Sequence, residues 1–142
     1  MTQLIAILED DERRIQAMRQ ILRQKLPKWS SHFFDNAPDM IVWLKEALLK
    51  VSLISLDHDL GQNRERNGEI FDPGIGRNVV DFLVTQKPIC PVIIHTTNMI
   101  GGEGMKYVLS QAGWYYERVV PFGDIEWIED LWIKKLLATI KG

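Results

Sequence analysis

The chain has little of what marks a secreted, membrane-spanning or nucleic-acid-binding protein. One cysteine among 142 residues excludes a disulfide framework, and Cys90 beside Pro91 is expected to be a buried apolar thiol in a reducing compartment. The apolar runs are no longer than a strand, which excludes a membrane-spanning helix. Seventeen Lys and Arg against 19 Asp and Glu give a net charge of -2 without a basic stripe, so a nucleic-acid polymer is not an expected partner.

The start of the chain and its composition favour a cytoplasmic protein of one domain. An apolar run at residues 4–8 leads directly into Glu9, Asp10 and Asp11, unlike a secretory signal. With 46% hydrophobic residues and no repeat, low-complexity segment or linker, residues 1–142 are predicted to fold around one core. The sequence leaves the oligomeric state open.

Strand-like and helix-like segments alternate along the chain. A short β-rich run is followed five times by a stretch whose apolar residues are three or four apart, the spacing of a helix with one buried face. This pattern predicts a doubly wound α/β fold with a parallel five-stranded sheet of order 2-1-3-4-5 and helices on both faces. The expected strands are residues 4–8, 29–34, 53–56, 91–95 and 115–120, and the expected helices are 12–26, 36–49, 75–86, 103–112 and 125–140.

One connection is long for an ordinary turn. Residues 58–74 are mostly polar and predict a functional loop or lid. Arg64 and Arg66 could reach a substrate phosphate from such a lid, although a solvated loop is the simpler explanation. The glycines of this region do not form a P-loop, because its lysine and its spacing are missing.

Polar side chains follow three of the expected strands. They are residues 9–11 after the first strand, 57–59 after the third and 95–98 after the fourth. In the order 2-1-3-4-5 these strands are neighbours, and their carboxyl ends meet in the crevice where ligands bind. Clustered carboxylates repel one another, and oxygen ligands with little sulfur favour Mg²⁺. The sequence therefore predicts a magnesium site at this edge of the sheet.

This arrangement resembles the receiver domain of response regulators. The resemblance implies that the acidic pair Glu9 and Asp10, together with Asp57, holds Mg²⁺. It makes Asp57 the residue that accepts a phosphoryl group, and it makes the backbone carbonyl of Asp59 a further metal ligand. By element order the resemblance covers nearly the whole chain.

The chain departs from an ordinary receiver after the fifth strand. The Thr or Ser that contacts the phosphoryl group falls on Thr96, or on Thr97 if the register shifts by one residue. A receiver carries a Lys-Pro pair after strand five, whereas this chain has Val120 before Pro121. That lysine pairs with the acyl phosphate, so the ordinary phosphorylation switch is in question. Arg118 could replace it, but the alternation of side chains along a strand leaves its direction open.

Several polar residues are not required of an ordinary receiver, namely His58, Asp59, His95 and Asn98. With them the chain is similar to the cyclic-phosphate processing receiver domains. That likeness implies a receiver fold that acts on, or binds, a cyclic phosphate such as a nucleotide derivative. The segments that carry it are residues 9–14, 56–61 and 95–98, followed by Gly101 and Met105.

Opening a cyclic phosphodiester requires neutralised phosphate charge, an activated water and a proton donor for the leaving oxygen. Mg²⁺ on Asp10 and Asp57 would provide the first. Histidine titrates near neutral pH, so His58 or His95 could transfer the protons, with Asp59 orienting a ring. The candidate catalytic residues are Asp57, His58 and His95, and the candidate phosphate-binding residues are Arg14, Thr96, Thr97 and Asn98.

Simpler explanations and other functions stay open at this point. Residues 9–11 could only cap a helix, residues 96–98 could only form a turn or cap, and either histidine could be structural. A receiver phosphorylated on Asp57 would act in signalling through a protein partner instead of a small cyclic phosphate. A catalytically inactive interaction module is the third possibility.

Overall fold

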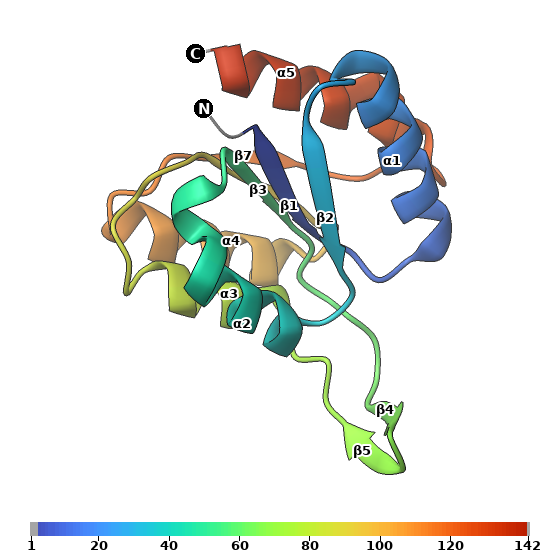
Figure 1. Ribbon diagram of the computed structural model, residues 1–142, viewed down its shortest axis with the longest axis vertical. Helices are drawn as coiled ribbons and strands as arrows, with labels where there is room; N and C mark the ends of the chain where they lie inside the picture. Colours follow the sequence, from blue (N-terminus) through green and yellow to red (C-terminus); the bar gives the residue numbers. More distant parts are fainter. Residues whose placement is uncertain (1–2, 142) are drawn as a thin grey trace.

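The computed structural model describes residues 3–141 and places five parallel strands between two layers of helices (Figure 1). The strand order is β2-β1-β3-β6-β7, so the predicted order 2-1-3-4-5 is confirmed, with β6 and β7 as its fourth and fifth strands. The strands are β1 Leu4–Leu8, β2 Ser30–Phe34, β3 Leu53–Leu56, β6 Val92–His95 and β7 Tyr116–Val119.

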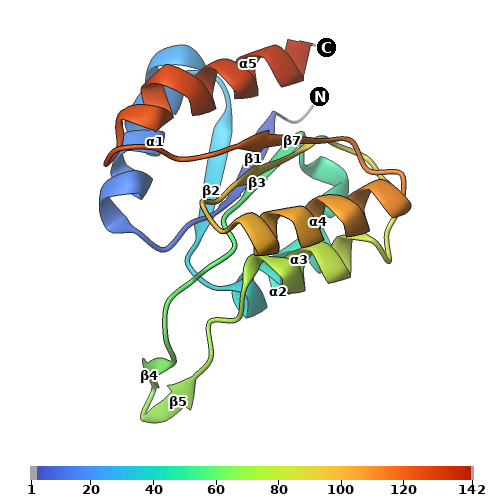
Figure 2. The ribbon, with the colours of Figure 1, turned by 180° about the vertical axis from the view of Figure 1, so that it is seen from behind.

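The helices cover the two faces of the sheet unequally (Figure 2). On one face lie α1 (Glu12–Lys25) and α5 (Ile133–Lys141). A π-helical turn, η2 (Ile128–Trp132), leads directly into α5. The other face is covered by α2 Ala37–Ala47, the short 3₁₀ turn η1 Leu48–Lys50, α3 Gly76–Leu83 and α4 Met99–Gln111. Within the described residues no helix has both the length and the apolarity to cross a membrane.

The central strands are buried on both sides, which is why they read as continuous apolar runs. Along β1 the side chains alternate between two cores: Ile5 and Ile7 pack with α1 and α5, whereas Leu4, Ala6 and Leu8 pack with α2, α3 and α4. Cys90 is buried as predicted, and burial raises the pKa of its thiol to about 12.

Polar side chains mark the starts of three helices. Asp11, Asn36 and Asn98 each accept a hydrogen bond from the backbone N–H three residues ahead, which satisfies one of the free donors of the first turn. Because Asn98 caps α4, this helix begins at Met99, and the prediction that it begins near residue 103 was wrong. Three glycines in the first two turns had hidden the helical pattern.

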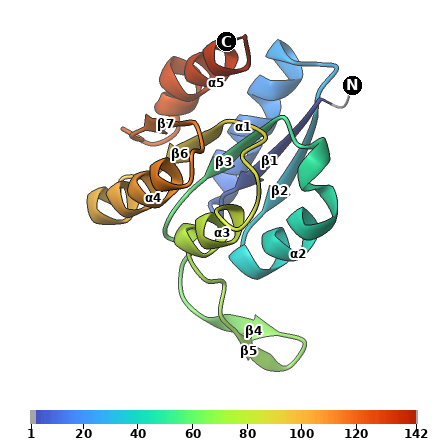
Figure 3. The same cartoon turned by 90° about the vertical axis from the view of Figure 1, so that its left-hand side faces the viewer.

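The long polar connection also contains more structure than the sequence analysis predicted. Its central part is a β-hairpin, β4 (Arg64–Arg66) and β5 (Glu69–Phe71), that projects from the body of the domain (Figure 3). Asn67 and Gly68 both have positive φ, 55° and 81°, as a two-residue hairpin turn requires.

The two arginines of the hairpin form ion pairs with acidic residues of the same chain. Arg64 pairs with Asp35 at 2.8 Å and Arg66 pairs with Asp39 at 3.1 Å, and both guanidinium groups lie over Phe71. These exposed ion pairs hold the hairpin against the start of α2. Each is expected to contribute little stability by itself, because water screens it.

Gly76, the first residue of α3, lies directly against the carboxyl end of β3. A Cβ at this position would overlap the carbonyl oxygen of Asp57 and lie 3.1 Å from the Cα of His58. We expect Gly76→Ala to lower the free energy of unfolding by about 3 kcal/mol, since the backbone must move to make room. Gly104→Ala, in the interior of α4, is the control and is expected to stabilise by about 1 kcal/mol. Equal urea midpoints for the two variants would contradict this packing.

Candidate functional site

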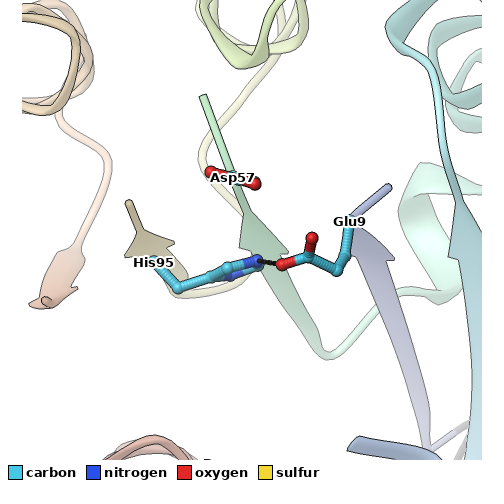
Figure 4. Close-up of side chains that lie close together, drawn as sticks. All are labelled: Glu9, Asp57 and His95. Carbon is cyan, nitrogen blue, oxygen red and sulfur yellow. Dashed lines mark hydrogen bonds and ion pairs between the residues drawn. The ribbon is translucent and has the colours of Figure 1, made fainter. Parts of the chain in front are cut away.

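Three polar side chains meet at the carboxyl edge of the sheet. Leu8 pairs with Leu56 and Leu56 pairs with Ile94, so the next residue of each strand, Glu9, Asp57 and His95, lies at the same level. One candidate ligand atom from each of the three lies within 4.8 Å of the others. Figure 4 shows the three side chains side by side.

Alternation along the strands explains why these side chains share a face. In β1 and β6 they continue the rows of Ile7 and Ile93, which belong to the core under α1 and α5. Glu9 and His95 are fully buried, and Asp57 is 6% exposed. The cluster is therefore a polar extension of one hydrophobic core and not part of the loop surface.

His95 is held on both sides by hydrogen bonds. Its Nδ1 lies 2.7 Å from the Ser55 hydroxyl, and its Nε2 lies 3.2 Å from Oε1 of Glu9. The indole N–H of Trp132 donates to the same Ser55 hydroxyl at 3.0 Å, and the ring of Trp127 stacks on the imidazole. Both imidazole nitrogens of His95 are thus engaged inside the protein.

Glu9 is a buried carboxylate that the protein keeps ionised. Burial by itself would raise its pKa, but the hydrogen bond from His95 lowers it. The N–H of Asp11, which donates to Oε2 at 3.0 Å, and the guanidinium of Arg14, 3.7 Å from Oε1, act in the same direction. The net result is a pKa below the ordinary value of a glutamate.

The carboxylates of Asp57 and Asp10 are shifted the opposite way. Burial raises the pKa of Asp57 to about 6, and the charge of Glu9 adds to this rise. Asp10 is exposed and lies outside the Glu9–Asp57–His95 cluster; partial desolvation and the charge of Glu9 raise its pKa. Oδ1 of Asp57 accepts the N–H of His58 at 2.7 Å, while its Oδ2 accepts no hydrogen bond from the described residues.

These carboxylates fit a divalent cation. Burial and mutual repulsion make their ionised forms costly, and a cation at the edge of the cluster would offset both effects. Glu9 and Asp57 keep unused acceptor capacity, because a carboxylate offers about four lone-pair sites. The carboxylates provide hard oxygen donors of the kind that Mg²⁺ prefers.

A second polar group lies beside this cluster, on the β3–β4 and β6–α4 connections. Nδ1 of His58 lies 2.8 Å from Oδ1 of Asp59, and the amide of Asn98 donates to both oxygens of Asp59 at 3.2 and 3.3 Å. The imidazole rests on Gly101, where a Cβ would lie 2.7 Å from the ring. Asp59 can only accept, so it holds the proton of His58 on Nδ1 and leaves Nε2 as an acceptor. Among the described residues nothing bonds to that Nε2.

The remaining candidates for phosphate binding occupy different environments. Thr96 is buried and its hydroxyl accepts the N–H of Asn98 at 3.1 Å, whereas Thr97 is exposed at the end of β6. Arg14 lies over the ring of Trp127 and beside Glu9. The carboxylate of Asp59 faces His58 and Asn98, so the side chain of this predicted metal ligand lies outside the Glu9–Asp57–His95 cluster.

Arg118, whose direction the sequence left open, turns toward α4. Its Nη2 donates to the backbone carbonyl of Thr96 at 2.7 Å, and its guanidinium packs against Gly102. Its Nε is buried without a partner in the part of the chain that the structure describes. The side chain thus supports the β6–α4 connection.

Sequence reasoning missed Ser55, Trp127 and Trp132 as parts of the site. Ser55 was a usable signal, because a serine inside an apolar central strand needs a buried hydrogen-bond partner. The tryptophans gave no such signal, since aromatic residues at helical spacing usually indicate core packing.

Comparisons with solved structures show the same fold. The signal receiver domain of a putative LuxO repressor protein from Vibrio parahaemolyticus has a TM-score of 0.68 at 16% identity, over 99% of this chain and 92% of that one. The response regulator domain of Thermotoga maritima CheB has a TM-score of 0.67 at 11% identity, over 100% and 98%. The Mn²⁺-bound form of response regulator Rcp1 has a TM-score of 0.63 at 16% identity, over 93% and 95%.

Sequence comparison adds the family. No curated protein matches the chain, but the family model described as the cyclic-phosphate processing receiver domain matches residues 5–111. This range contains the carboxylate cluster, the His58–Asp59 pair and the Asn98 cap. The chain therefore belongs to the cyclic-phosphate processing receiver domain family.

Proposed function

We propose that this protein uses Mg²⁺ and His58 to open a cyclic phosphodiester, such as that of a nucleotide derivative. The observation that carries the proposal is the pairing of two groups at one sheet edge. An ionised, fully buried Glu9 stands beside Asp57. Next to them, Asp59 orients His58, whose Nε2 has no partner among residues 3–141. The name of the family points to the same class of substrate.

Glu9, Asp10 and Asp57 would hold the cation, together with the backbone carbonyl of Asp59. When bound, Mg²⁺ neutralises charge on the phosphate oxygens. The neighbour Rcp1, which shares this fold, was solved in an Mn²⁺-bound form, and this supports a divalent ion here. Oδ2 of Asp57 accepts no hydrogen bond from the described residues, so it would be free to bind the cation.

His58 is the better candidate for proton transfer. In the hydrolysis, the oxygen of water bonds to phosphorus, one ester P–O bond breaks, and the leaving alkoxide gains a proton, so the products are a phosphomonoester and a hydroxyl group. Nε2 of His58 can take the proton of the water or return one to the leaving oxygen. The Asp59 carboxylate stabilises the imidazolium that forms in between.

The phosphate oxygens need donors as well. Thr97 is exposed just after β6, whereas Thr96 is buried. The side-chain N–H groups of Asn98 already donate to Asp59 beside His58, and Arg14 adds positive charge beside Glu9. We assign Thr97 as a direct phosphate contact and Asn98, Arg14 and Thr96 as supporting residues.

A second candidate function is a signalling receiver that is phosphorylated on Asp57 and acts through a protein partner. The fold and the position of Asp57 at the end of β3 favour it. Two observations argue against an ordinary phosphorylation switch. Position 120 holds a valine and not a lysine, and Arg118 donates to the Thr96 carbonyl.

One pair of assays on the purified protein separates the two functions. The first follows Mg²⁺-dependent opening of 2′,3′- and 3′,5′-cyclic nucleotides and of simpler cyclic phosphates by ³¹P NMR. The second follows labelling of Asp57 by acetyl phosphate, with Asp57→Asn as the negative control. Asp81→Asn, the same substitution at an exposed position of α3, is the matched control. We expect opening of at least one cyclic phosphate, lost in Asp57→Asn alone. Stable labelling without any opening would favour the signalling function.

A further inference from the structure

We propose that Trp132, Ser55 and His95 form a buried hydrogen-bond relay that positions Glu9, and that His95 is a positioning residue and not a proton donor in the reaction. The relay runs from the C-terminal helical segment through β3 and β6 to β1, that is, across the sheet to the carboxylate cluster. The expected effect of this relay on metal binding rests on the proposed function.

The hydrogen-bond chemistry gives the relay a direction. The indole N–H of Trp132 can only donate, so the Ser55 oxygen accepts it. The Ser55 hydroxyl proton is then free to bond to Nδ1 of His95, which places the ring proton on Nε2, where Glu9 accepts it. In this arrangement each donor of the chain reaches an acceptor.

Burial makes the relay necessary. Trp132, Ser55, His95 and Glu9 all have 0% exposure, so water cannot replace a missing partner. An unsatisfied buried donor or acceptor destabilises the fold, and an unpaired buried charge does so more strongly. The relay supplies Glu9 with one hydrogen-bond donor and the N–H of Asp11 supplies another, while the guanidinium of Arg14 forms an ion pair at 3.7 Å. Glu9 is therefore fixed in place beside Asp57.

The helix that provides the relay has an unusual backbone at this position. Trp132 is the last residue of the π turn η2. Trp127, which stacks on the His95 ring, is the residue immediately before this turn. Residues five apart in a regular α-helix point about 140° apart, because each residue turns by about 100°. The wider π turn brings both indoles toward the sheet, and such turns are frequent at functional sites.

The same geometry makes His95 unsuited to proton transfer with a substrate. Its ring is fully buried, and its two nitrogens bond to Ser55 and Glu9. His58, by contrast, is partly exposed, and no described residue bonds to its Nε2. The two histidines that the sequence analysis treated alike thus differ in accessibility and in the groups that face them.

The first test removes one N–H from the far end of the relay. Trp132→Phe and Ser55→Ala are compared with Trp114→Phe. This control deletes an indole N–H that is buried in the other core and has no partner in the part of the chain that the structure describes. Loss of an outer-shell hydrogen bond usually weakens metal binding 10- to 100-fold. We expect such a loss of Mn²⁺ affinity in Trp132→Phe and Ser55→Ala, and an unchanged affinity in Trp114→Phe.

Nitrogen-15 NMR of the histidine ring provides a readout that does not depend on the metal. Metal-free wild type is expected to show His95 protonated on Nε2, and Trp132→Phe and Ser55→Ala to show a mixture of tautomers. Unchanged tautomer and Mn²⁺ affinity in both variants would overturn the relay. Failure of wild type to bind Mn²⁺ would instead overturn the proposed function, and the tautomer result would still decide whether the relay exists.

His95→Gln distinguishes positioning from proton transfer. The glutamine amide keeps an N–H donor for Glu9, whereas His95→Leu removes it. A positioning role predicts that His95→Gln retains Mn²⁺ affinity within about threefold of wild type and that His95→Leu loses it as Trp132→Phe does. Equal loss in the two His95 variants would contradict the positioning role.

Discussion

Asp57→Asn is expected to stabilise the metal-free protein above pH 6 while it abolishes metal binding. Burial and the charge of Glu9 raise the pKa of Asp57 from 3.8 to about 6 in the folded protein. Between these two pH values the unfolded chain has already lost the proton that the folded chain keeps. Ionising the folded form therefore costs stability as the pH rises, and the cost is complete above pH 6.

The size of this effect follows from the change in pKa. A pKa difference of about 2 between the folded and unfolded chain corresponds to about 3 kcal/mol of unfolding free energy. The amide introduced by Asp57→Asn carries no charge at any of these pH values and avoids the loss. The wild type should therefore lose about this much stability between about pH 4 and pH 7 through Asp57, and the variant should not.

Urea unfolding with EDTA at a series of pH values measures the difference directly. Asp81→Asn, which removes an exposed carboxylate on α3, is the matched control and should follow the wild-type pH profile. Addition of Mg²⁺ at pH 7.5 should stabilise wild type and Asp81→Asn by ligand binding, but not Asp57→Asn. Parallel pH profiles for wild type and Asp57→Asn would mean that Asp57 carries no unfavourable buried charge.

The order of the sheet and the position of the site could be predicted because both depend on local patterns. Apolar runs such as residues 4–8 and 53–56 have the bounds of β1 and β3, and polar residues follow where each strand leaves the core. Parallel order then brings their ends together. The hairpin was missed although Asn67-Gly68 is a strong turn signal, because its three-residue strands are exposed and show no apolar alternation.

The different roles proposed for His58, proton transfer, and for His95, positioning of Glu9, could not be predicted from sequence. Both histidines follow an apolar run and stand beside polar residues, but one faces α1 and α5 and the other rests on Gly101. The difference depends on strand register and on how the π turn rotates Trp127 and Trp132. These are properties of packing between elements, which local periodicity does not contain.

His58→Ala is expected to have the largest effect on activity. Loss of a positioned acid–base group usually lowers the rate 10²- to 10⁴-fold, so kcat for opening the cyclic phosphate should fall by this range. Mn²⁺ affinity should stay within about threefold of wild type, because the His58 ring contacts Asp59 and Asn98 and no predicted carboxylate ligand of the Glu9–Asp57–His95 cluster. Asp59→Asn should lower kcat as well, since the ring loses the group that orients it.

His32→Ala is the matched control, because His32 lies on the edge strand β2 and stacks on Trp43 away from the site. It should leave kcat and Mn²⁺ affinity unchanged. The decisive comparison is between His58→Ala and His95→Gln, measured as kcat on the same cyclic phosphate. If His58→Ala keeps its kcat while His95→Gln loses it, proton transfer belongs to the buried histidine. In that case the His95 ring, which is fully buried in this structure, would have to become accessible to the substrate.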